Sequence, residues 1–177
     1  YARFYKQIEP YAERVDKGGL LPDELMLPIV NQVIESHIQD GKNTFIFTGF
    51  PRTIEQLRAV DKYTQSLREK YSSVNVDYVC CAVLEQHSKR RAEQRRENAR
   101  RIGAAIRKDD NPNIVLTRLQ TYRNTTEPML HLLVLEKRLR IIKSSGTIEE
   151  TRERTIRALG ILKLNQEVRG RNPYEKR

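Results

Sequence analysis

The chain has 177 residues and a net charge of +10, from 33 Lys and Arg against 23 Asp and Glu. Its length and its 38% apolar content are enough for one domain with its own core, and no run of 18 apolar residues predicts a membrane-spanning helix. The excess of positive charge favours anionic partners, namely nucleotides, nucleic acid or anionic lipid surfaces, without choosing among them.

The first 43 residues are predicted to form helices. Apolar residues at helical spacing run from 4 to 15, with Pro10 as an interruption, and Gly18-Gly19 ends the segment. A longer helix is predicted from Asp23, as the N-terminal cap, to Asp40-Gly41.

Residues 44–56 (TFIFTGFPRTIEQ) predict a buried strand, a tight turn and the start of a helix over 54–70. The strand is expected at Phe45–Phe47. Arg52 would then project beyond the carboxyl end of that strand, where ligands bind in open α/β sheets. Its planar guanidinium suits bidentate phosphate binding, although an ordinary surface arginine after a turn gives the same pattern.

A second strand is predicted over Val74–Leu84, where apolar residues are nearly continuous and indicate burial on both faces. Strand, helix and strand in this order suggest a parallel, right-handed unit. The adjacent Cys80 and Cys81 would point to opposite faces, so we expect buried free thiols and an intracellular, reducing compartment. The three histidines are scattered, and no metal site is predicted.

Residues 89–108 are the most basic part of the chain, with nine Lys and Arg against two Glu. Three interpretations stay open: a solvated helix face, a clamp for a triphosphate, or a surface that binds RNA.

The remaining elements are predicted from local signals. A helix pair is expected over 112–138 with a break at Pro128, followed by a short strand at 139–142. The last helix should begin after a Thr147 cap and end near Gly160. The basic tail, 163–177, is expected to be extended or disordered unless a partner holds it.

Two separate blocks of sequence resemble the signature of adenylate kinases and related nucleoside-monophosphate kinases. The first is GFPRT-x-x-Q at 49–56, and the second is R-K-D-D-N-P-N-I-V-L-T-R-L-Q-T-Y at 107–122. The resemblance covers roughly residues 15–160. It implies an α/β fold with a parallel sheet flanked by helices.

The resemblance also implies a domain organisation. Residues 1–162 would form one adenylate-kinase-like domain, followed by the tail. Within the domain, residues 1–43 would form the flap over the monophosphate, and residues 89–108 would form a short lid. The lid has no C-x-x-C pair, so no structural zinc is implied.

The resemblance assigns roles to individual residues. Gly49, Arg52 and Gln56 would bind an AMP-like nucleotide, with Arg52 holding its phosphate and Gln56 contacting the adenine edge. Asp109 and Asp110 would brace the closing lid. Four arginines would neutralise the transferring phosphoryl group: Arg91, Arg95, Arg107 and Arg118.

The sequence departs from the family pattern in two places. None of its eight glycines forms the G-x-x-x-x-G-K loop that cradles the β- and γ-phosphates of ATP. Thr48 stands where these kinases have an acidic residue that orients water around Mg²⁺, and a neutral hydroxyl is a weak ligand for that ion.

These departures predict that catalysis is lost or impaired and that the chain is a structural or assembly subunit of a larger complex. The charge favours a complex that contains RNA, such as a mitochondrial ribosome, with RNA contacts at 89–108 and 163–177. The expected location is the mitochondrial matrix or the cytoplasm.

Two alternatives remain open. One is an active kinase that converts ATP and a nucleoside monophosphate into ADP and a nucleoside diphosphate, using ATP and Mg²⁺, with its phosphate loop upstream of residue 1. The other is a nucleotide sensor that binds AMP without turnover.

Overall fold

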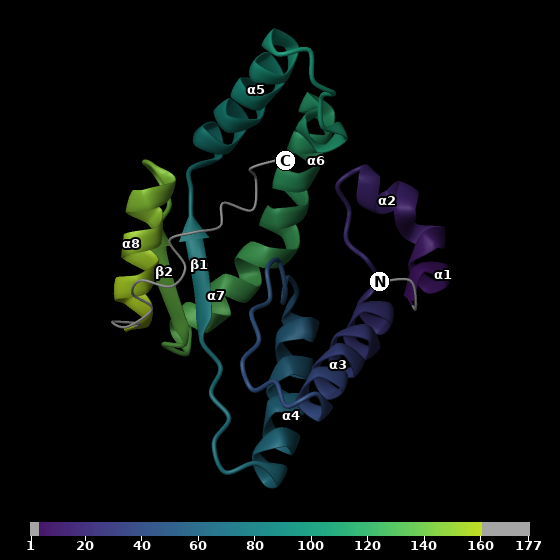
Figure 1. The fold of residues 1–177 in the computed structure, drawn as a ribbon, viewed down its shortest axis with the longest axis vertical. Coiled ribbons are helices and arrows are strands. Elements are labelled where there is room, and N and C mark those ends of the chain that lie inside the picture. Colours follow the sequence, from purple (N-terminus) through teal and green to yellow (C-terminus); the bar gives the residue numbers. More distant parts are fainter. Residues whose placement is uncertain (1–3, 161–177) are drawn as a thin grey trace.

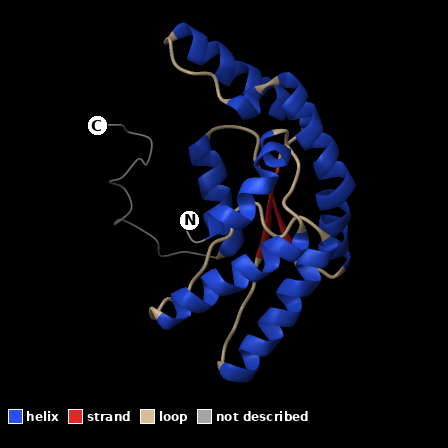
Figure 2. Cartoon of the chain, turned by 90° about the vertical axis from the view of Figure 1, so that its right-hand side faces the viewer, coloured by secondary structure: helices blue, strands red, loops and turns tan. Residues whose placement is uncertain are grey.

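A small parallel sheet surrounded by helices is the centre of the computed structural model, which describes residues 4–160 (Figure 1). Strand β1 spans Tyr78–Ala82 and strand β2 spans Leu139–Lys143, and they pair in parallel from Tyr78 opposite Leu139 to Ala82 opposite Lys143. Helices make up most of the described chain (Figure 2). They are α1 (Tyr5–Ile8), the 3₁₀ turn η2 (Glu9–Tyr11), α2 (Ala12–Asp16), α3 (Asp23–Gln39), α4 (Ile54–Lys70), α5 (Glu85–Arg101), the 3₁₀ turn η3 (Lys108–Asp110), α6 (Pro112–Thr121), the π-helical turn η4 (Tyr122–Thr126), α7 (Glu127–Leu135) and α8 (Ile148–Leu159).

The main core lies where α4 and α7 meet one end of the sheet. Its buried members are Leu57 of α4, Tyr78 of β1, and Met129 and Leu133 of α7. Leu57 is 1% exposed and Leu133 is 0% exposed, so burial of apolar surface holds these three elements together. The chain is therefore a helix-rich α/β protein, as the sequence predicts.

A polar cluster lies at the edge of this core. Arg138 donates a 2.9 Å hydrogen bond to Asp61 of α4, and its guanidinium lies 5.1 Å from the centre of the Tyr78 ring. Burial, together with the Asp61 carboxylate, raises the pKa of Tyr78 to about 12. The cluster links α4, β1 and the turn before β2.

Several predicted elements are confirmed. Helix α4 spans Ile54–Lys70, and the Thr53 hydroxyl caps it by accepting a 3.0 Å hydrogen bond from the Gln56 backbone N–H. Helix α8 begins with a capping box between Thr147 and Glu150 and ends at Gly160, whose φ of +66° lies in the left-handed region.

The predicted strand at Phe45–Phe47 is absent from the structure. Residues 42–47 have no regular secondary structure, and Ile46 is 89% exposed. Their aromatic rings contact those of His37 and Phe50 instead. A strand needs a neighbour for its backbone N–H and C=O groups, and among the described residues β1 pairs with β2 and with no part of this segment. The parallel pair is thus β1 with β2.

The second predicted strand is shorter and less buried than expected. Only Tyr78–Ala82 of the 74–84 run forms β1, and Val79 is 37% exposed. The expectation that both cysteines are buried is wrong, because Cys80 is half-buried and Cys81 is exposed. The sheet has two strands within the described chain, so one edge of β1 is unpaired there.

The structure also differs from two local predictions. Helix α3 begins at Asp23, with Pro22 as its cap residue, and the Asp23 side chain makes no cap hydrogen bond. The break in the helix pair is the π-helical turn at Tyr122–Thr126, directly before the helix that contains Pro128.

The expectation for the tail at 163–177 lies outside the described residues, as do residues 161–162 of the predicted domain. Between residues 4 and 160, no helix has both the length and the apolar character needed to cross a membrane.

Candidate nucleotide-binding site

The turn before α4 holds Arg52 in a fixed position. The Arg52 Nε donates a 2.6 Å hydrogen bond to the backbone carbonyl of Gly49. Gly49 has a φ of +73°, which favours glycine, and a Cβ at this position would displace the Arg52 guanidinium from its present place. The turn thus places a half-buried guanidinium at the start of a helix.

Gln56 is connected to three neighbours. Its Oε1 accepts a 2.7 Å hydrogen bond from the Arg52 backbone N–H, and its Nε2 donates a 2.7 Å hydrogen bond to Asp23 Oδ1. Asp23 Oδ2 accepts a further 2.7 Å hydrogen bond from the Thr53 hydroxyl. Gln56 is only 4% exposed, so this network joins α3 to α4 inside the molecule.

Arg107 and Arg118 share one carboxylate. Arg107 donates two hydrogen bonds to Asp109, of 2.9 and 2.8 Å, and Arg118 donates one of 3.1 Å to the same side chain. The hydrogen bonds from Arg107 are the largest cause that lowers the pKa of Asp109, and the charge of Arg118 lowers it further. Asp109 therefore stays ionised and orders both guanidinium groups.

Arg52 lies close enough to Arg118 for the two charges to interact. Burial, and then the positive charge of Arg118, lower the pKa of Arg52 from its ordinary value. Two neighbouring guanidinium groups repel each other, and an anion between them removes that repulsion. Because α6 carries Arg118 and the turn before α4 carries Arg52, the fold brings together two arginines that are 66 positions apart in the sequence.

Arg95 and Asp110 form a separate, more buried pair. Asp110 is 1% exposed, and Arg95 donates to both of its carboxylate oxygens, with a shortest distance of 2.6 Å. Arg96 donates a 3.1 Å hydrogen bond to the Asp110 backbone carbonyl. These contacts attach α5 to the turn η3 and so fix the base of the predicted lid.

Arg91 lies one turn before Arg95 on α5. It donates a 2.7 Å hydrogen bond to the Ser144 carbonyl, in the loop between β2 and α8. It also lines an open cavity of about 820 Å³, together with Thr147 and Thr151. Of the four arginines predicted to act together, Arg107 and Arg118 meet at Asp109, Arg95 binds the neighbouring Asp110, and Arg91 faces a different loop.

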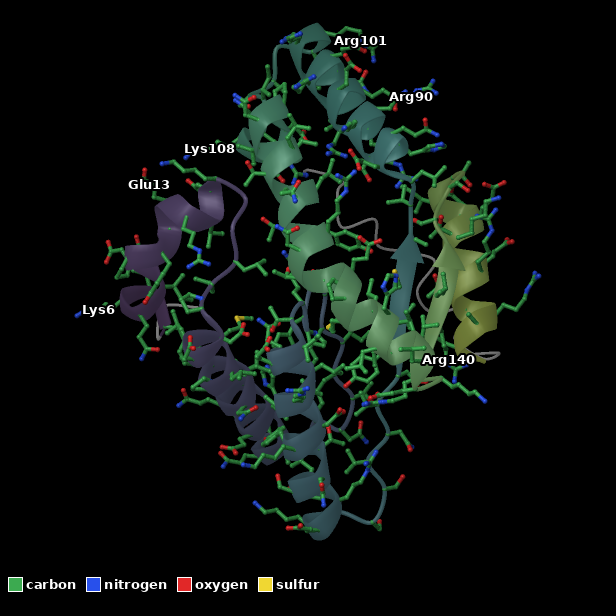
Figure 3. All side chains as sticks on the ribbon, turned by 180° about the vertical axis from the view of Figure 1, so that it is seen from behind. Lys6, Glu13, Arg90, Arg101, Lys108 and Arg140 are labelled. Carbon is green, nitrogen blue, oxygen red and sulfur yellow. The ribbon has the colours of Figure 1, made fainter. Side chains whose placement is uncertain are left out.

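The N-terminal helices contact this region. The Lys108 Nζ lies 3.5 Å from a carboxylate oxygen of Asp16, and Lys108 appears beside α2 in Figure 3. A Cβ on Gly18 would lie 2.7 Å from the Arg118 Cγ, so this glycine allows the segment after α2 to approach α6.

Sequence reasoning missed two contributors to the site. Asp23 was expected to cap α3, and Gly18 was expected only to end a helix. For Asp23 the sequence gives no signal, because its partners Thr53 and Gln56 are 30 and 33 positions away. For Gly18, the double glycine in the sequence indicates an unusual backbone conformation, but it does not indicate the contact with Arg118.

Among residues 4–160, no three His, Cys, Asp or Glu side chains lie together in an arrangement that could hold a metal ion. Thr48 is exposed and adds only a neutral hydroxyl beside Gly49.

Fold and site together define a helix-rich α/β protein with one arginine, Arg52, at the turn before α4 and a second, Arg118, on α6. The family model for adenylate kinase matches residues 6–137, which is well over half of the chain. The chain belongs to the adenylate kinase family.

Individual relatives support this membership. An adenylate kinase of Nitrobacter hamburgensis is 32% identical over 142 residues, covering 80% of this chain and 65% of the relative. One of Caldicellulosiruptor bescii is 31% identical over 172 residues, covering 84% and 76% respectively. One of Beijerinckia indica is 37% identical over 116 residues, covering 65% and 56%. The chain thus spans between about half and three quarters of the length of these relatives.

Proposed function

We propose that this chain binds a nucleoside monophosphate, and that Arg52 and Arg118 hold its phosphate. The observation that carries the proposal is the half-buried Arg52 guanidinium, which its 2.6 Å hydrogen bond to the Gly49 carbonyl holds in place, and the positive charge of Arg118 lowers the pKa of Arg52 further. A phosphate dianion between them would accept hydrogen bonds from both and neutralise their repulsion.

The surroundings support an anion at this place. Arg52 is half-buried, and its Nε is already engaged by the Gly49 carbonyl, so the side chain is held in position before a ligand binds. Asp109 orders Arg118 from the other side through a 3.1 Å hydrogen bond. Gln56 accepts a 2.7 Å hydrogen bond from the Arg52 backbone N–H, which also fixes the turn that carries Arg52.

Arg52→Ala tests this proposal. The variant should bind AMP about 30-fold more weakly than the parent chain, since hydrogen bonds to a charged partner contribute roughly 1.5–3 kcal/mol. Isothermal titration calorimetry measures the affinity. Arg58→Ala is the matched control, because Arg58 is exposed on α4, the helix that follows Arg52, and it should leave the affinity unchanged. Equal losses in both variants, or no loss in Arg52→Ala, would contradict the assignment.

Phosphoryl transfer is the alternative to binding alone. In that reaction Arg91, Arg95 and Arg107 would join Arg118 in neutralising the transferred group. It would also need the G-x-x-x-x-G-K loop, which does not occur in these 177 residues.

A second candidate function is assembly into an RNA-containing complex, and the surface of α5 favours it. Five exposed cations lie on this helix, and Arg90 and Arg101 extend away from the body of the molecule (Figure 3). The full set is Lys89, Arg90, Arg95, Arg100 and Arg101, of which Arg95 also binds Asp110. Such a surface would bind RNA through its phosphates, with little dependence on sequence.

Salt dependence tests this second function. If Arg90 and Arg101 contact phosphates, the double variant Arg90→Ala/Arg101→Ala should reduce the slope of log affinity against log salt by about 1.4 for single-stranded RNA. Fluorescence anisotropy with a labelled oligonucleotide measures the slope. Lys62→Ala, at an exposed position of α4, is the control. An unchanged slope in the double variant would rule out this surface.

A further inference from the structure

Gly18 lies against the first part of the Arg118 side chain. A Cβ on Gly18 would lie 2.7 Å from the Arg118 Cγ, 3.2 Å from the Ile114 carbonyl oxygen and 3.4 Å from the Arg118 backbone nitrogen. Two of these three atoms belong to the backbone of α6 and cannot move aside without displacing the helix. The segment after α2 therefore covers the stem of Arg118 this closely only because residue 18 has no side chain.

The charged end of Arg118 is held at a second point. Its Nη1 donates the 3.1 Å hydrogen bond to Asp109, and the side chain is 51% exposed. An arginine stem has several rotatable bonds, so a single hydrogen bond at an exposed tip restrains it only weakly. Contact along the stem removes rotamers that the hydrogen bond alone would allow. The covered stem and the ordered tip together hold the guanidinium in place before a ligand binds.

The contact depends on Gly18 rather than on its neighbours. A Cβ on Gly19 would lie 2.9 Å from the Arg14 Cγ and 3.1 Å from the Arg14 carbonyl oxygen, so that glycine faces α2 and not α6. The ion pair between Lys108 and Asp16, at 3.5 Å, also joins the N-terminal segment to the turn η3. Both of its side chains are mostly exposed, and such a pair contributes little. Close packing at Gly18 is thus the tighter contact.

We propose that Gly18 is a positioning residue for phosphate binding. By leaving room for the stem of Arg118, it lets the segment after α2 hold the Arg118 guanidinium where it can donate hydrogen bonds to the phosphate. This inference rests on the proposed function, since it assumes that Arg118 binds the phosphate of a nucleoside monophosphate. A side chain at position 18 has to push the Arg118 stem or the N-terminal segment aside, and a guanidinium that is not held in advance has to be ordered at the expense of affinity.

Gly18→Ala tests the inference, because it adds only the Cβ that would meet Arg118. AMP affinity should fall about fivefold, which corresponds to the cost of ordering one long side chain on binding. The affinity for adenosine should change less than about twofold, because the hydrogen bonds of Arg118 go to the phosphate that adenosine lacks. Isothermal titration calorimetry measures both affinities, and thermal unfolding shows that the variant is folded.

Gly41→Ala is the matched control. Both glycines follow a helix, have a positive φ (+92° at Gly18 and +78° at Gly41), and their N–H groups donate a 2.9 Å hydrogen bond to the carbonyl three residues before. Apart from its chain neighbours, a Cβ on Gly41 would meet no heavy atom of the described residues within 4 Å. Alanine there has similar backbone strain without the contact, so the ratio of AMP affinity to adenosine affinity should not change. Equal losses of AMP affinity in the two variants would overturn the inference.

A second measurement uses the unmodified chain without ligand. In a ¹H NOESY spectrum, the Gly18 Hα and Arg118 Hγ protons should give a cross-peak. The NMR order parameter of the Arg118 Nε–H group should exceed that of Arg58, which is exposed on α4. A missing cross-peak, equal order parameters, or an unchanged AMP affinity in folded Gly18→Ala would overturn the inference and leave the proposed function intact. A parent chain that binds AMP no more tightly than adenosine would overturn the proposed function itself.

Discussion

Replacing Leu133 with alanine is expected to lower the free energy of unfolding by about 3 kcal/mol. Leu133 is 0% exposed and lies in the core cluster with Leu57, Tyr78 and Met129. Truncating this side chain removes buried apolar contacts and leaves a cavity between α4, α7 and the sheet. Urea denaturation followed by circular dichroism measures the change.

Val134→Ala is the control for this prediction. Val134 is the next residue of α7 and is 47% exposed, so the shorter side chain should cost less than about 1 kcal/mol. If the two variants are equally stable, the core does not lie where the structure places it.

Replacing Arg95 with alanine is expected to destabilise the chain by a similar amount, about 3 kcal/mol. The reason differs, because the variant leaves the Asp110 carboxylate, whose side chain is 2% exposed, without its bidentate partner. An uncompensated buried charge costs more than the ion pair contributes. Urea denaturation again measures the effect.

A double variant separates the charge effect from loss of packing. In Arg95→Ala/Asp110→Ala the buried charge is gone, so this variant should be more stable than Arg95→Ala alone. Arg90→Ala, at an exposed position of the same helix, should change stability by less than about 0.5 kcal/mol. A double variant that is less stable than the single one would contradict the account of this pair.

Local signals predicted the elements whose structure depends on nearby residues. Helix α4 has a Thr cap, α8 has a capping box followed by glycine, and β2 is a short apolar run, and the structure contains all three. The strand at Phe45–Phe47 fails because an apolar run forms a strand only beside a pairing partner. Local sequence contains no information on whether that partner is present.

The residues of the site also fall into those that the sequence indicated and those that it could not indicate. The resemblance to adenylate kinases selected Arg52, Arg107 and Arg118 as candidates, and the structure places Arg107 and Arg118 on one carboxylate. Asp23 could not be found from the sequence, because its partners come from another helix. Its local pattern, proline followed by two acids, is that of an ordinary helix start.

The most direct test of the central claim compares AMP with adenosine as ligands of the unmodified chain. The two differ only in the phosphate, which we assign to Arg52 and Arg118. In isothermal titration calorimetry, AMP should bind at least tenfold more tightly than adenosine, because two guanidinium groups each contribute charge-assisted hydrogen bonds to the phosphate. Equal affinity for both ligands, or no binding of AMP, would contradict the claim that this arginine pair is a phosphate site.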